Sequence, residues 1–437
     1  MKYLHYYENE TEFANVYDTE SYIEPWVSLI NDEKKVNYNK MCLSFEIVAD
    51  GTIKWTPATR DIAIEYKTKG TPWTTMPGTL NVEAGQRIKF KGTNDSKLGS
   101  FSGSTAQFNV YGNIMSVVNF TTFRTLTTLP AEKMFLGLFC KCAGLLSSKN
   151  LILPATTLTS ECYRQMFEDC TSLTNSPMLP ADTLASGCYY SMFSGCTNFE
   201  HAPALPANTL AEKCYFNMFG ECVGLTEAPA LPAMNLAKQC YDRLFYKCYS
   251  LKEPPELPAT TMAELCYSSM FHSSGILQTP KLHSTNLAEN CYAYMFQSCS
   301  GITETTELSA TTLAEGCYHD MFADCQNLTK APALPATALT DNCYSLMFYL
   351  CKSLVTAPDL NASILTPNCY YRMFSTCTSL RYVKCLATNI SATNCTEEWM
   401  TRVSTTGGVF VKAASMADWT RGISGIPTGW TVVDNNE

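Results

Sequence analysis

The chain has 437 residues, of which 46% are hydrophobic and 16% charged, so it is long enough to bury a large core. A net charge of −9 and a pI near 5.2 argue against nucleic acid and anionic membrane surfaces as partners, because both favour a basic face. No apolar run approaches the roughly 18 residues of a membrane-spanning helix. The amino terminus lacks the apolar region of a secretory signal. Either a signal has been removed or the protein does not use that route, and the initial methionine favours the second.

Two segments precede the repeats described below. Residues 1–41 form an acidic, aromatic leader. Residues 42–118 are predicted to fold as a small Ig-like β-sandwich, because short alternating runs are separated by Gly, Pro, Asn and Ser. The predicted strands lie at 43–48, 52–55, 62–66, 80–82, 88–90 and 108–111.

A cysteine recurs through residues 119–395 at intervals of 26 residues, with one interval of 25 between Cys266 and Cys291. A period of this size indicates a stack of similar units, that is, a solenoid. Such an array offers a long surface for binding rather than a buried catalytic cleft. The recurring residues are Cys162, Cys188, Cys214, Cys240, Cys266, Cys291, Cys317, Cys343, Cys369 and Cys395.

Each unit is predicted to contain one strand and one helix. From Leu210 the apolar residues fall at offsets 0, 4, 5, 8, 9 and 12, which cover one half of a helix. Thr209 and Glu212 match a capping box, and a short extended stretch, 225–231, follows the helix. The predicted fold is therefore an α/β solenoid, a leucine-rich-repeat-like array of about ten strand-helix units. Residues 396–437 lose the repeat and are predicted to form its C-terminal cap.

The 22 cysteines are expected to be buried, reduced thiols. Cys162 and Cys170 lie eight residues apart, about 12 Å along a helix, and equivalent residues of packed helices are about 8–10 Å apart. Both separations exceed the roughly 7 Å between Cα atoms that a disulfide tolerates. Ser274 replaces the second cysteine of one unit, which a compulsory disulfide would not allow. Disulfides or metal binding are the alternatives.

Nothing in the sequence indicates catalysis. The five histidines have no metal-ligand spacing, and Cys140 and Cys142 form a Cys-x-Cys pair that lacks a second half. Neither a glycine-rich phosphate loop nor a nucleophile motif is present. We therefore expect no enzyme activity, no catalytic residue, no cofactor and no metal site.

The candidate binding residues are aromatic side chains at variable positions of the repeat, chiefly two and six residues after the first cysteine. These positions should face outward, and exposed rings provide a large contact area for sugar or protein at a low entropy cost. Tyr190 and Phe216 should be neighbours on adjacent units. Ordinary partly buried packing and the strand side, around His201 and Glu227, are the alternatives. The predicted ligand-binding residues are Tyr190, Phe216, Tyr246, Tyr294, Tyr349 and Tyr371.

The run Met-Phe-x-x-Cys-Thr-Ser-Leu, at 166–173 and 373–380, resembles the BspA-like leucine-rich repeat, although the units here have 26 residues rather than about 23. The resemblance implies a strand-and-helix solenoid that acts as a surface adhesin. The leader, with Glu24-Pro25-Trp26-Val27-Ser28, and the tail, 425–430, resemble virion-associated repeat proteins of phages of anaerobic gut bacteria.

These resemblances imply a phage fibre or receptor-binding component on the virion surface. Residues 1–41 would attach it to the virion, and the array would bind a host cell-surface glycan or protein. By analogy with such fibres, a homotrimer is expected. The alternatives are a BspA-like adhesin on a bacterial cell surface and a glycan-cleaving enzyme.

Overall fold

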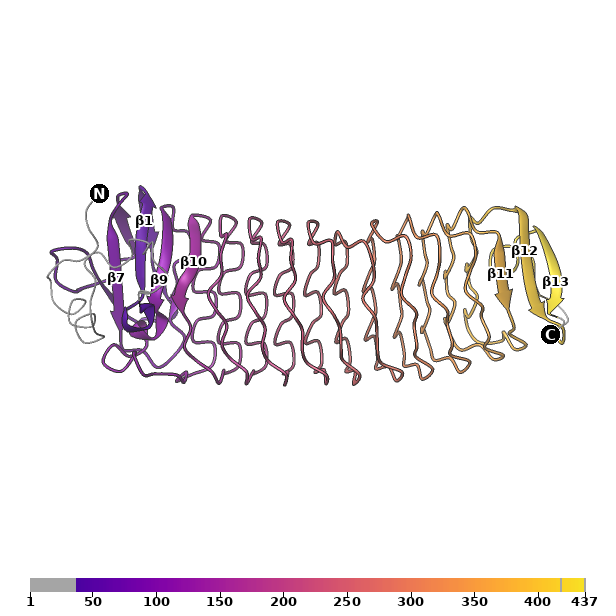
Figure 1. The fold of residues 1–437 in the computed structure, drawn as a ribbon, viewed down its shortest axis with the longest axis horizontal. Coiled ribbons are helices and arrows are strands. Elements are labelled where there is room, and N and C mark those ends of the chain that lie inside the picture. Colours follow the sequence, from indigo (N-terminus) through magenta and orange to yellow (C-terminus); the bar gives the residue numbers. More distant parts are fainter. Residues whose placement is uncertain (1–36, 417–418, 436–437) are drawn as a thin grey trace.

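A row of similar coils connects a group of strands at the N-terminal end to three parallel strands at the C-terminal end (Figure 1). This computed structural model describes residues 37–416 and 419–435. The predicted leader lies outside the described residues except for its last five, which include the 3₁₀-helix η1 (Tyr38–Lys40). One continuous hydrophobic core extends from Leu43 to Trp430.

The N-terminal strands form one six-stranded sheet, in the order β10-β9-β1-β7-β4-β5, and two short pairs, β2-β6 and β3-β8. Pairing is antiparallel except between β9 and β10, which are parallel. The elements are β1 (Ser44–Ala49), β2 (Gly51–Lys54), β3 (Thr56–Pro57), β4 (Ile64–Lys67), β5 (Thr74–Thr75), β6 (Thr79–Val82), β7 (Arg87–Gly92), β8 (Gly99–Ser100), β9 (Gln107–Asn113), the 3₁₀-helix η2 (Ile114–Val117) and β10 (Leu145–Ile152).

Alternating burial explains this sheet. In β7 the side chains of Ile88 and Phe90 are buried between partly exposed neighbours, as expected for a strand with one covered face. Phe45 of β1 packs against Phe90 and Phe108 at ring-centroid distances of 4.6 and 4.7 Å. The predicted strands at 43–48, 52–55, 80–82, 88–90 and 108–111 agree with β1, β2, β6, β7 and β9.

The array contains no α-helix among the described residues, so the predicted α/β solenoid of strand-helix units is wrong. The segments predicted as helices are chains of successive tight turns, one coil stacked on the next (Figure 1). Each coil is named below by its first cysteine.

The hydrogen bonds of these turns alternate between two partners. In the Cys162 coil the N–H of Arg164 donates to the carbonyl of Glu161, three residues back, at 3.2 Å. The next N–H, of Gln165, donates instead to the carbonyl of Tyr190 on the following coil at 2.8 Å. An α-helix would direct both N–H groups to carbonyls four residues back in its own segment. Here half of them join neighbouring coils.

The turns impose a period of four residues rather than 3.6. Every fourth residue has a positive φ, as at Glu161 (52°), Gln165 (56°) and Asp169 (57°). Side chains therefore alternate in pairs, two buried and two outward. The offsets that predicted a helix in Leu210–Cys222 fit this pattern equally well over so short a segment.

Buried side chains of one kind stack along the array. Rings of equivalent tyrosines and phenylalanines are nearly parallel, with centroids 5.8 Å apart for Tyr163 and Tyr189 and 5.4 Å apart for Phe167 and Phe193. The thiol of the second cysteine donates to a phenylalanine carbonyl of the preceding coil, as from Cys196 to Phe167 at 3.1 Å. All 22 cysteines are free, so the prediction of reduced thiols is confirmed in the structure.

On the opposite side, neighbouring coils are joined by isolated parallel β-bridges, mostly between residues 26 apart. Thr209 bridges Thr183 on one side and Asn235 on the other. Thr209 is thus part of a series of bridges and does not precede a helix. The predicted capping box with Glu212 is therefore wrong. These are bridges between single residues, so the predicted strand in each unit is reduced to isolated contacts.

Aromatic rings close the core at both ends. At the N-terminal end, Phe101 stacks on Phe139 of the first coil at 5.7 Å and its N–H donates to the carbonyl of Leu138. At the C-terminal end, Trp399 occupies the methionine position of most other coils, and its ring stacks between Tyr370 and Trp419. The three strands there, in order, are β11 (Tyr382–Cys385), β12 (Thr406–Ala413) and β13 (Gly429–Asn435).

We expect native protein to protect nearly all of its thiols. Twenty of the 22 cysteines are buried, and burial raises the pKa of the partly exposed Cys140 to about 11, which disfavours the reactive thiolate. Maleimide labelling followed by mass spectrometry should therefore modify at most Cys42 and Cys140 before unfolding, and all 22 afterwards. Rapid labelling of further sites in the folded protein would contradict the buried thiol ladder.

The left-handed turn positions should limit stability where they carry an aliphatic residue. Leu346 has φ 56°, a conformation that costs about 1–2 kcal/mol for a residue other than glycine and less for asparagine. We expect Leu346→Asn to raise the free energy of unfolding by about 1 kcal/mol, measured by urea titration. Val355→Asn, at an exposed site without positive φ, should not raise it. Equal effects of both substitutions would argue against strain at Leu346.

Candidate functional site

The outward side chains of the turns form one long surface, called the turn face below. It consists of the residues two, three, six and seven positions after the first cysteine of each coil. The third and seventh positions are the ones with positive φ, as Gln165 and Asp169 illustrate. Because the intervening positions are buried and repetitive, the chemistry of the array varies mainly on this face. All six predicted binding residues lie on it, and each is half-buried.

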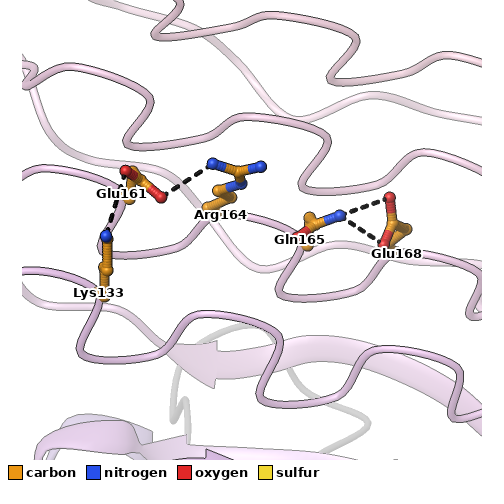
Figure 2. Close-up of polar contacts among 5 residues, drawn as sticks. All are labelled: Lys133, Glu161, Arg164, Gln165 and Glu168. Atoms are coloured by element: carbon orange, nitrogen blue, oxygen red, sulfur yellow. Dashed lines mark hydrogen bonds and ion pairs between the residues drawn. The ribbon is translucent and has the colours of Figure 1, made fainter. Parts of the chain in front are cut away.

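Polar side chains cross between coils at the start of the turn face. Glu161 accepts from Arg164 at 2.9 Å and lies 3.6 Å from the Lys133 ammonium of the preceding coil (Figure 2). Gln165 donates to both carboxylate oxygens of Glu168 (Figure 2). The charged groups of these side chains are therefore already paired with one another.

An aromatic stack follows. The ring of Tyr190 lies on that of Phe216, with centroids 4.5 Å apart and planes 13° apart. The Arg164 guanidinium covers Tyr190 at 4.4 Å, and that of Arg243 lies 5.9 Å from the centroid of Phe216. The four side chains form a continuous row over four coils. The structure thus brings two predicted residues together, with an arginine at each end.

The middle of the face is hollowed. A cavity of about 410 Å³ opens between the Cys214 and Cys291 coils, and both Tyr246 and Tyr294 line it. Tyr246 packs against His272 at 5.1 Å, and Tyr294 meets His319 edge-on at 5.2 Å. The remaining lining residues are Asn217, Glu221, Arg243, Ser269, His272 and Gln297.

Tyr349 and Tyr371 lie further along and do not line this cavity. Tyr371 contacts the Arg372 guanidinium at 5.2 Å, and Arg372 pairs with Glu398 at 2.7 Å. Of the six predicted residues, the structure therefore groups Tyr190 with Phe216 and Tyr246 with Tyr294. The sequence analysis missed Arg243, Asn217 and Ser269, because a helix of 3.6 residues per turn places the third position beside the core rather than outside.

Two ionisable side chains at or beside the cavity, Asp242 and His272, have shifted pKa values. Burial raises the pKa of Asp242 to about 6, although a hydrogen bond from Gln239 and the charges of Arg243 and Lys213 oppose this. The pKa of His272 is lowered, first by burial and then by the positive charges of Arg243 and Lys247. His272 is therefore neutral near pH 7 and lies in a locally positive field, although the chain as a whole is acidic.

The described residues contain no group of three or more His, Cys, Asp or Glu side chains placed to hold a metal ion. Burial raises the pKa of the ladder cysteines, to about 12 for Cys162 and Cys214, which removes their nucleophilic character. In the part of the chain that the structure describes, no helix is long and apolar enough to cross a membrane.

The chain matches no protein-family model, no curated protein and no solved structure.

The raised pKa of Asp242 predicts a pH-dependent stability. A carboxyl group with a higher pKa in the folded state binds its proton more tightly there, so stability falls as pH rises from about 4 to about 6 and then stays level. Asp242→Asn removes this loss. We expect urea unfolding to show the variant more stable than the original at pH 7.5, by up to about 3 kcal/mol, with the difference disappearing near pH 4. The exposed control Asp182→Asn should change little at either pH.

Proposed function

We propose that this protein is a non-enzymatic adhesin that recognises a glycan or protein of a host cell surface through its turn face. In this proposal it is a phage fibre or receptor-binding component, displayed on the virion and attached through residues 1–41. The assignment to a virion follows from the resemblance of the leader and tail to virion-associated repeat proteins. The assignment to adhesion follows from the turn face.

The cavity lined by Tyr246 and Tyr294 is the observation that carries the proposal. It combines half-buried rings with Arg243, Asn217 and Gln297, which offer charged and amide hydrogen-bonding groups. Such combinations of side chains bind sugars and peptides, because the rings cover the apolar faces of the ligand while the polar groups fix its orientation. The rings are already ordered by neighbouring coils, which reduces the entropy that binding must overcome.

The regular backbone also supports this proposal. Each coil is joined to the next by several hydrogen bonds on the turn face and by stacked rings beneath it. Side chains on adjacent coils are therefore fixed relative to one another. A rigid array of this kind suits recognition of an extended polymer or a broad protein surface.

Removing the two cavity rings should weaken binding to cells. We expect the Tyr246→Ala/Tyr294→Ala double variant to bind at least about tenfold more weakly than the original chain, because two ring contacts are lost. Fluorescently labelled protein can be titrated by flow cytometry on a panel of anaerobic gut bacteria and their capsule-deficient derivatives. Met178→Ala, which trims an 80% exposed side chain outside the turn face, is the matched control.

Two outcomes would contradict the proposed function. The original chain could bind none of the bacteria, or the double variant could bind as tightly as the control while its thermal unfolding is unchanged. Release of sugars from capsule by the purified chain would point to an enzyme instead.

A further inference from the structure

The Cys266 coil lies lower than its neighbours on the turn face because three of its four outward side chains are serines. Its outward positions carry Ser268, Ser269, His272 and Ser273, and Ser274 and Gly275 follow. The preceding coil has Arg243, Tyr246 and Lys247 at matching positions, and the following coil has Tyr294 and Gln297. The three serines, lying beside the long side chains of Arg243, Tyr246 and Tyr294, leave a trench along this coil.

Two hollows occupy this trench. The first is the cavity of about 410 Å³ described above, with Ser269 and His272 among its lining residues. The second, of about 390 Å³, continues along the same coil past Ser273, Ser274 and Gly275, and Tyr249 stands at its edge with 52% of its surface exposed. The packed pair of Tyr246 and His272 lines the first hollow, and the adjacent Ser273 lines the second.

The trench is not a break in the array. The N–H groups of Tyr267 and Ser269 still donate to Cys291 and Ala293 of the next coil, at 3.0 and 2.8 Å. The shortened interval after Cys266 is absorbed on the opposite side, where the described residues show no β-bridge between Thr261 and Asn286. On the turn face, the floor therefore makes the same backbone hydrogen bonds to the next coil as the other coils do.

Arg243 lines the first hollow and differs from three other cations of the turn face, which are paired. Arg164 pairs with Glu161, Arg372 with Glu398 and Lys247 with Glu221, all within 3 Å. Arg243 is exposed and makes neither an ion pair nor a side-chain hydrogen bond with any residue that the structure describes, although Phe216 lies beneath its guanidinium. Its planar donors remain available at the wall of the first hollow.

We propose that this trench binds an acidic saccharide whose carboxylate is held by Arg243. The sugar rings would lie along the Cys266 coil against Tyr246 and Tyr294, and their hydroxyl groups would bond to Gln297 and the serines of the floor. A guanidinium binds a carboxylate through two parallel hydrogen bonds, a geometry that a neutral sugar cannot match. This inference rests on the proposed function and specifies its ligand.

The charges around the trench favour an anion. Lys247 lies 2.9 Å from Glu221, the acidic residue of the lining, and so offsets its charge. Asp242 is buried and accepts a hydrogen bond from Gln239, so it does not occupy the guanidinium of Arg243.

The decisive experiment compares a carboxylated saccharide with its neutral twin. Calorimetry or surface plasmon resonance would measure binding of the full chain to surface polysaccharide from a bound bacterium, before and after chemical reduction of its carboxyl groups. Tetragalacturonate with its methyl ester, and a sialic acid tetramer with its ester, serve as defined probes that separate uronic from sialic acids. The variants are Arg243→Gln and, as a matched control on the same face but outside the trench, Arg402→Gln, which removes another exposed arginine.

We expect Arg243→Gln to weaken binding of native polysaccharide by about tenfold or more, since a charge-assisted bond pair is lost. Reduction of the carboxyl groups should weaken binding by the original chain to a similar extent. It should not weaken binding by the Arg243→Gln variant any further. Arg402→Gln should bind as the original does. The proposal is overturned if Arg243→Gln binds native polysaccharide normally, or if reduction leaves the affinity of the original chain unchanged.

These results separate this proposal from the proposed function. Cell binding that survives both Arg243→Gln and carboxyl reduction refutes the acidic saccharide and leaves the adhesin. Binding of a defined acidic probe without binding to any cell supports the saccharide site and refutes the adhesin. If the chain binds neither cells nor the defined acidic probes, both the adhesin and the acidic-saccharide site are refuted.

Discussion

The structure depends on how the turns distribute their backbone hydrogen bonds. One N–H closes a turn within the coil, and the next donates to the following coil, as Arg164 and Gln165 do. A lone coil would leave every second N–H without a partner, and unsatisfied buried polar groups are costly. Coils are therefore stable only as a stack whose two ends are covered. The rings of Phe101 and Trp399 supply those covers.

This arrangement also determines where the sequence can vary. Two residues of every four lie in the core, where identical rings and thiols stack on their equivalents in the next coil. Cys196, for example, packs in the core and donates to the carbonyl of Phe167. The other two residues face outward and are nearly free of core packing. Surface chemistry can thus change from coil to coil while the backbone stays the same, which is how a serine-rich coil lies between two aromatic ones.

The sequence predicted the stacking period, the reduced thiols and most N-terminal strands because each depends on strong, local signals. It could not distinguish a turn ladder from a helix, since apolar residues at offsets 0, 4, 5, 8, 9 and 12 satisfy both periods over three turns. The distinguishing signal was at the left-handed positions, where glycine and asparagine recur, as at Gly187, Asn217, Gly316 and Asn342. A helix would not favour those residues every fourth position. Predicting a helix also left Arg243 out of the candidate site, because Arg243 occupies one of these left-handed positions.

The missing residue after Cys266 shows that the two sides of a coil carry different constraints. On the turn face, a deletion would misalign every hydrogen bond between two coils and move buried rings such as Tyr267 and Phe271 out of their stacks. On the bridge side, only isolated contacts are lost, such as the one absent between Thr261 and Asn286 among the described residues. The deletion is found on the bridge side, where its cost is lower. The turn face therefore keeps its register through the coil that forms the trench floor, and Arg243, Ser269 and Tyr294 hold their positions across it.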